Sequence, residues 1–156
     1  LTRRSRSRTG HRLLGGAHAA DTRHNHLCQG SADTGMTGAE TPHMRTDAEE
    51  LLERGLDVAE RAWGLTKTEL GWRNATPDTV CCHQVGRAHR ERLYQRLHLD
   101  PGKDFSTFET LGNCGSASLP VTAGMAVEEG RVRAGSTLAL LGIGSGINCM
   151  MLGVQW

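Results

Sequence analysis

The sequence predicts an α/β fold in which apolar strands alternate with amphipathic helices. Helical periodicity begins near Thr46, and the segments that follow have the order helix, strand, helix, helix, strand, strand. The strands are nearly continuous apolar runs, which is typical of a sheet that helices cover on both faces. The chain has 156 residues, enough for one domain with a hydrophobic core.

The first part of the chain is polar and shows little periodicity. Residues 1–10, LTRRSRSRTG, are expected to be a disordered end or an artificial boundary, because a nucleic-acid-binding patch would carry interleaved aromatic residues. Residues 11–21 predict a short strand. The Gly-, Thr- and His-rich residues 22–44 are expected to form a loop.

Charge and cysteine content exclude several classes of protein. The 18 basic and 17 acidic residues nearly cancel, so the net charge does not indicate a nucleic acid or an anionic membrane as partner. No apolar run is long enough to span a membrane. The five cysteines lack the spacing of a disulfide framework, which favours a reducing compartment, and we therefore expect a cytoplasmic protein.

The first two helices and the strand between them follow from local patterns. Apolar residues at helical spacing predict a helix over residues 47–64, preceded by a capping box at 46–49. Residues 78–84, DTVCCHQ, read as a buried strand that ends at a polar tip. A second helix is predicted over residues 86–98, before the stop signal LDPGK.

The C-terminal third predicts one helix and a hairpin. Residues 117–130 form a helical pattern in which Pro120 is tolerated in the first turn and Gly130 marks the end. Residues 136–144 and 147–155 read as two apolar strands, and the glycine turn GIGSG joins them.

Three polar features are candidates for chemistry. His83 ends a buried strand, Asn113 lies just ahead of a helix, and GIGSG stands at a strand-to-strand turn. Strand ends and helix N-termini are where ligands meet converging donors in α/β sheets. A histidine and an amide aimed at one point can hold a carbonyl oxygen that gains negative charge. Taken singly, each feature is also common in ordinary structure, as a satisfied histidine or a plain turn.

The three features together resemble the C-terminal half of thiolase-fold condensing enzymes of the 3-oxoacyl-(acyl carrier protein) synthase III group. The resemblance is carried by HQVG from His83, GNCGSAS from Gly112 and LLGIGSGINCMMLGVQW from Leu140. HNHLCQG, MRTDAEELLERGL and GIGSGINC are most similar to the branch that condenses two fatty acyl-CoA chains head to head in long-chain olefin biosynthesis.

The resemblance implies an architecture and a mechanism. The architecture is a layered α/β/α/β/α fold, of which this chain supplies mainly the C-terminal half: residues 11–45 end the preceding half and 46–156 form a half-domain. The mechanism is a Claisen condensation of acyl-CoA or acyl-carrier-protein thioesters. A cysteine absent from this chain carries one acyl group, and His83 and Asn113 activate the second thioester. The backbone around Gly144 and Ser145 stabilises the oxyanion at the acylated cysteine.

The resemblance also bears on partners and cofactors. The implied complete enzyme includes an N-terminal half with the nucleophile and forms a homodimer. It has no cofactor beyond the coenzyme A or phosphopantetheine of the substrate. In this chain Cys114 replaces the usual Thr and Gly86 an Asn. Cys114 is expected to be a packing substitution, and Cys81 to be packed rather than paired catalytically with His83.

Two other functions stay open. One is a non-catalytic chain that keeps the fold and binds a partner with the missing cysteine half. The other is a metal-binding module that uses His24, His26 and Cys28, or the cluster around Cys81 and His83. No closed four-ligand spacing supports the second, and we predict no metal site.

Overall fold

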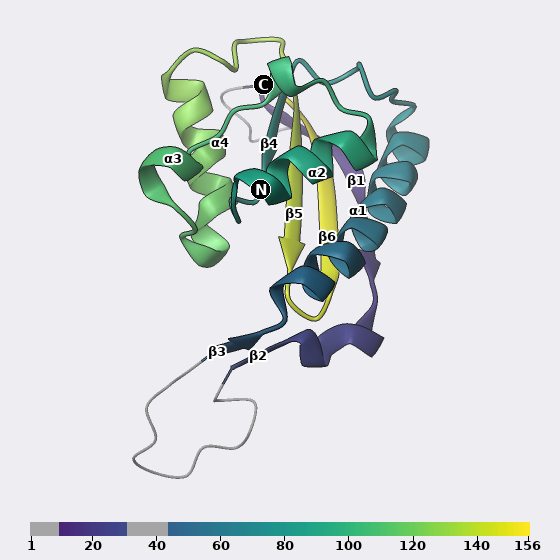
Figure 1. Ribbon diagram of the computed structural model, residues 1–156. Helices are drawn as coiled ribbons and strands as arrows, with labels where there is room; N and C mark the ends of the chain where they lie inside the picture. The colour runs from purple at the N-terminus through teal and green to yellow at the C-terminus, as the bar shows by residue number, and fades with distance from the viewer. Residues whose placement is uncertain (1–9, 31–43) are drawn as a thin grey trace.

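The computed structural model describes residues 10–30 and 44–156 and has the α/β class that the sequence predicts. A four-stranded mixed sheet lies between helices (Figure 1). Its strands are in the order β1 (Arg12–Ala20), β6 (Asn148–Gln155), β5 (Thr137–Gly144) and β4 (Thr79–Cys82). β4 and β5 run parallel, and β6 is antiparallel to both of its neighbours. The C-terminal ends of β4 and β5 therefore lie at the same end of the sheet.

The long helix α1 (Ala48–Leu70) extends six residues beyond its predicted end. It begins one residue later than the capping box suggested, because the Asp47 side chain accepts a hydrogen bond from the backbone N–H of Glu50. The buried hydroxyl of Thr66 donates to the carbonyl of Met151 in β6 at 3.3 Å, which fixes the added turns on the sheet. Gly71, with a left-handed φ of 64°, ends the helix.

The remaining helices cover opposite faces of the sheet. They are α2 (Arg87–Leu97), the single turn α3 (Phe108–Leu111) and α4 (Ser118–Glu128), with short 3₁₀ turns η4 (Pro101–Lys103) and η5 (Gly115–Ala117). Because side chains alternate along a strand, Cys82 and Leu141 pack with α1 and α2, whereas Cys81 and Leu138 pack with α4. Both faces of β4 and β5 are thus covered, as predicted.

The prediction of a loop over residues 22–44 is in part wrong. After β1 the chain forms the 3₁₀ helix η2 (Thr22–Leu27) and the strand β2 (Cys28–Gly30), which pairs antiparallel with β3 (Met44–Thr46). The side chain of Asp21 caps η2 by accepting from the backbone N–H of Arg23. The pairing of β2 with β3 joins segments 18 residues apart, as in Cys28 with Thr46, so a local pattern did not reveal it. Residues 31–43 lie outside the described part, as do residues 1–9 of the expected disordered end.

The strand expected near residues 11–21 is present as β1, and it pairs with β6 along its length. The predicted boundary between residues 45 and 46 stays a prediction, and the first segment shares a sheet with the second. Three apolar side chains in this part of the sheet are exposed: Met150, which is 51% exposed, and Leu13 and Leu14 of β1. Among the described helices none is long and apolar enough to cross a membrane.

Candidate functional site

The three predicted site segments meet at one end of the sheet. His83 directly follows β4, and its backbone N–H donates to the carbonyl of Leu141 in β5 at 2.9 Å. The N-terminal turn of α4 lies over the same end, because Leu119 packs against Gly142 of β5. The GIGSG turn continues β5 from that point. Figure 1 shows the start of α4 on the side of the sheet toward which the β5 arrow points.

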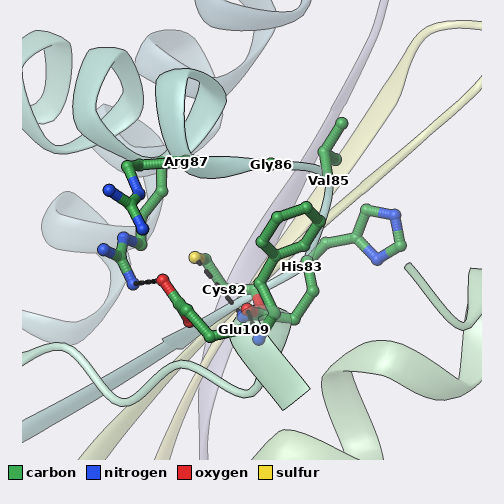
Figure 2. A pocket seen from close by; sticks show the side chains of 9 residues that line it. Cys82, His83, Val85, Gly86, Arg87 and Glu109 are labelled. Atoms are coloured by element: carbon green, nitrogen blue, oxygen red, sulfur yellow. Dashed lines mark hydrogen bonds and ion pairs between the residues drawn. The ribbon is translucent and has the colours of Figure 1, made fainter. Parts of the chain in front are cut away.

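His83 is half-buried, and its burial favours the neutral form of the imidazole. Burial lowers the pKa of His83 below its usual value, because desolvation disfavours the imidazolium. Figure 2 shows the ring pointing away from Arg87 and Glu109, outside the cluster of charged side chains. A neutral imidazole at this place can donate one hydrogen bond to a ligand.

Asn113 lies in the exposed turn between α3 and α4. Its Oδ1 accepts from the backbone N–H of Gly115 at 2.9 Å, which fixes the orientation of the amide. Gly112 before it has φ 64° and ψ −153°, a conformation reserved for glycine. After it, the backbone N–H of Cys114 donates to the buried Oγ of Ser118 at 2.9 Å. The local sequence therefore fixes both flanks of Asn113.

His83 and Asn113 both have side-chain donor atoms without a hydrogen-bond partner in the described part of the chain. Within the described part of the chain, neither the ring nitrogens of His83 nor Nδ2 of Asn113 makes a hydrogen bond, and the two side chains do not bond to each other. Each can thus donate to a third group. Two such donors at one carbonyl oxygen would stabilise negative charge that develops on it.

The GIGSG turn is clamped on the side opposite to α4. Ser145 Oγ donates to Cys28 Sγ at 3.3 Å, and Ile147 exchanges two backbone hydrogen bonds with Asp21 at 2.8 and 3.0 Å. Asn148 Nδ2 donates to the carbonyl of Ser145 at 2.9 Å. Gly144 and Ser145 are themselves exposed. β2 and η2, the elements that sequence reasoning missed, therefore shape this turn.

Gln84 is a central residue to which the sequence analysis gave no role. The residue is 3% exposed, and both polar atoms of its side chain have hydrogen-bond partners. Nε2 donates to the carbonyl of Cys82 at 2.7 Å, and Oε1 accepts from Ser106 Oγ at 2.9 Å and from the backbone N–H of Phe108 at 3.1 Å. The end of β4 is thus tied to the start of α3. The position of Gln84 in the HQVG motif is the sequence feature that could have pointed to this residue.

A charged cluster flanks this bridge. Arg90 of α2 lies 3.5 Å from a carboxylate oxygen of Glu109 in α3 and 3.4 Å from one of Asp104. Tyr94 OH donates to the other oxygen of Asp104 at 2.6 Å. Together with residues 82–87 and Phe108, Arg90 and Glu109 line a narrow pocket behind His83.

His89, one turn into α2, is a second histidine that the sequence analysis missed. Burial, with a smaller contribution from the positive charge that His83 can carry, lowers the pKa of His89 to about 4. His89 Nδ1 is buried and has no hydrogen-bond partner in the part of the chain that the structure describes. His89 is therefore a neutral neighbour of the candidate site.

Three of the five cysteines are buried as thiols. Burial raises the pKa of the Cys81, Cys82 and Cys149 thiols to about 12 in each case. Cys81 packs between the sheet and α4, as expected. The packing role expected for Cys114 is wrong, because that side chain is exposed and its thiol donates to the carbonyl of Leu111 at 3.3 Å.

The residues considered for a metal module have other contacts. The rings of His24 and His26 stand 6.3 Å apart, and Cys28 Sγ accepts from the hydroxyls of Ser145 and Thr46. In residues 10–30 and 44–156 no three His, Cys, Asp or Glu side chains are placed to share a metal ion. No observation favours this alternative.

Comparison with known proteins gives a consistent family match. The family model described as 3-oxoacyl-[acyl-carrier-protein (ACP)] synthase III C terminal matches residues 68–156. An acyl-CoA:acyl-CoA alkyltransferase of Shewanella oneidensis is 42% identical over 94% of this chain and 42% of its own length. The beta-ketoacyl-[acyl-carrier-protein] synthase III of Agrobacterium fabrum is 26% identical over 81% of this chain and 38% of its own.

Solved structures agree with the fold. OleA of Xanthomonas campestris superposes with a TM-score of 0.87 at 34% identity, over 99% of this chain and 42% of the other. The 3-oxoacyl-(acyl carrier protein) synthase III, FabH, of Xanthomonas oryzae gives the same TM-score and identity over 43% of its length. The chain therefore spans less than half the length of the proteins that it matches.

Proposed function

Because this chain belongs to the family of 3-oxoacyl-(acyl carrier protein) synthase III C-terminal regions, we propose that it is the C-terminal half of an acyl-thioester condensing enzyme. The proposed reaction is a Claisen condensation of two acyl thioesters, which makes the complete protein an acyltransferase of fatty-acid or lipid metabolism. The observation that carries the proposal is the position of His83 and Asn113, which lie toward the same end of the sheet with side-chain donors that have no hydrogen-bond partner in the described part of the chain.

The chemistry requires an enolate on the second thioester, which forms when its α-carbon loses a proton to a base of the complete enzyme or loses a carboxylate as carbon dioxide. In the proposed site, the neutral imidazole of His83 and Nδ2 of Asn113 both donate to its carbonyl oxygen. The enolate carbon then attacks the carbonyl carbon of the acyl group held on a cysteine of the missing part, and the cysteine thiolate leaves. Donors that are already oriented stabilise the charge more than water does, because they need no reorganisation.

The turn at Gly144 and Ser145 has a separate proposed role. Its backbone N–H groups stabilise the oxyanion that forms when the acylated cysteine is attacked. The contacts of Cys28 and Asp21 that clamp the turn support this role, because an oxyanion hole has to be rigid.

The proposed partners follow from the fraction of its relatives' length that the chain covers. The missing N-terminal half carries the nucleophile and covers the apolar surface at Met150, Leu13 and Leu14. We propose acyl-CoA or acyl carrier protein as thioester donors, a homodimer as the complete enzyme, and a cytoplasmic location. The proposed enzyme needs no cofactor beyond the coenzyme A or phosphopantetheine of its substrates.

The experiment compares the complete polypeptide with this chain alone. The complete polypeptide, incubated with long-chain acyl-CoA, is expected to release one coenzyme A on acylation and to form a β-ketoacyl-CoA detectable by mass spectrometry. This chain alone is expected to form none. Release of coenzyme A without carbon–carbon bond formation would contradict the proposal, and product that appears only when a separate cysteine-bearing protein is added would favour the partner-subunit alternative.

A further inference from the structure

The bridge at Gln84 connects the two halves of the proposed donor pair. Gln84 follows His83 directly in the chain, and its Oε1 accepts from the backbone N–H of Phe108 at 3.1 Å. Phe108 begins the single turn α3, whose end at Gly112 is closed by a hydrogen bond from the Gly112 N–H to the Phe108 carbonyl. Asn113 follows at once. One amide side chain thus links the strand that presents His83 to the turn that presents Asn113.

The side chain of Gln84 supports the start of α3, where the N-cap residue makes no side-chain cap bond. Thr107 is the N-cap residue of α3, but its side chain makes no cap bond to the helix. Its hydroxyl instead bonds to that of Thr122 in α4 at 2.7 Å. The N–H of Phe108, the first free N–H of α3, instead donates to Gln84 Oε1 at 3.1 Å, with Ser106 Oγ as a second acceptor at 3.3 Å.

A second partner of Gln84 brings the charged cluster into the same network. Ser106 Oγ stands 2.9 Å from Gln84 Oε1 and 3.1 Å from Glu109 Oε2, so its single proton serves one acceptor at a time. Glu109 is also paired with Arg90 of α2 at 3.5 Å. The bridge is therefore held between α2 and α3.

We propose that Gln84 is a positioning residue that sets the distance and orientation of His83 relative to Asn113. The inference rests on the proposed function. Gln84 is buried behind the donor pair and touches no substrate in this account. It acts through the backbone, because its three hydrogen bonds fix where β4 ends and where α3 begins. A displacement of about 1 Å between two catalytic groups is enough to slow a reaction about 100-fold.

The test uses Gln84→Met in the complete polypeptide, with Gln95→Met as the matched control. Methionine keeps the length of the side chain but removes all three hydrogen bonds, whereas Gln95 is exposed on α2, away from the bridge. We expect Gln84→Met to lower the condensation rate about 10- to 100-fold with little change in KM, and to leave acylation of the nucleophile unchanged. The control is expected to alter neither half-reaction.

The conservative variant Gln84→Glu is expected to restore part of the condensation rate at low pH. In Gln84→Glu a protonated carboxyl can both accept from the Phe108 N–H and donate to the Cys82 carbonyl, whereas a carboxylate repels that carbonyl. The condensation rate of Gln84→Glu relative to wild type is expected to rise as the pH falls from 8 to 5. A ratio fixed at the level of Gln84→Met throughout this range would contradict the inference. Should Gln84→Met fail to fold, Ser106→Ala, which removes one donor to Oε1, is expected to slow condensation alone.

The results distinguish failure of this inference from failure of the proposed function. His83→Ala in the same assay is the reference: unchanged condensation in that variant would overturn the proposed function itself. Loss of condensation in His83→Ala together with wild-type condensation in Gln84→Met would overturn only the positioning role. Equal loss of acylation and condensation in Gln84→Met would also overturn it, because a purely structural defect affects both half-reactions.

Discussion

The substitution Gly112→Ala tests whether the backbone before Asn113 is as constrained as the structure indicates. Gly112 has φ 64° and ψ −153°, a region that side chains other than hydrogen rarely enter. A Cβ built there meets no atom within 4 Å, so the whole cost is conformational. If the turn keeps its shape, the free energy of unfolding of the complete polypeptide is expected to fall by about 1–3 kcal/mol.

The same substitution at an exposed helical glycine is the control. Gly64 of α1 also has open space around its Cβ position and has an ordinary helical conformation. Gly64→Ala is therefore expected to raise the free energy of unfolding by about 0.5–1 kcal/mol, opposite in sign. Urea unfolding measures both values, and the condensation rate should fall only in Gly112→Ala. A Gly112→Ala protein with wild-type stability and activity would refute this reasoning.

Two more predictions concern titratable groups. Because burial lowers the pKa of His89 to about 4 from 6.5, the unfolded state binds its proton more readily, and stability is expected to be about 2 kcal/mol lower at pH 5 than at pH 8. Urea unfolding across this range checks it, and His89→Gln should reduce the slope; an unchanged slope would be evidence against the burial of His89. Iodoacetamide at pH 8 is expected to modify exposed Cys114 in the folded protein but not the buried thiols of Cys81, Cys82 and Cys149. Peptide mapping by mass spectrometry identifies the modified cysteines. Rapid modification of the three buried thiols would contradict their packing.

Elements with strong local signals were predictable from the sequence. α4 and the β5–β6 hairpin follow from apolar patterns bounded by Pro120 and the GIGSG turn, and the structure has them within two residues of the predicted bounds. The end of α1 was not predictable in this way, because its last turns depend on the hydrogen bond of Thr66 to Met151, 85 residues away. The β2–β3 pair likewise depends on a partner strand rather than on its own composition.

The candidate site, like the fold, was predictable from the sequence only in part. His83 and Asn113 were visible because each stands at a strand or helix end within a distinctive motif. The network around Gln84 was not, since its partners at Ser106 and Phe108 lie 22 and 24 residues away in the sequence. A buried amide with three partners is a property of the folded chain, and sequence spacing alone does not contain it.

The central claim is that His83 and Asn113 act on the second thioester after the nucleophile has been acylated. The most direct measurement is a single-turnover reaction in which the complete polypeptide is first acylated and then mixed with the second thioester, with the acyl mass on the protein followed over time. Wild type is expected to lose the acyl group as the condensed product forms, whereas His83→Ala and Asn113→Ala acylate normally and keep it. Variants that discharge the acyl group into product at the wild-type rate would contradict the account.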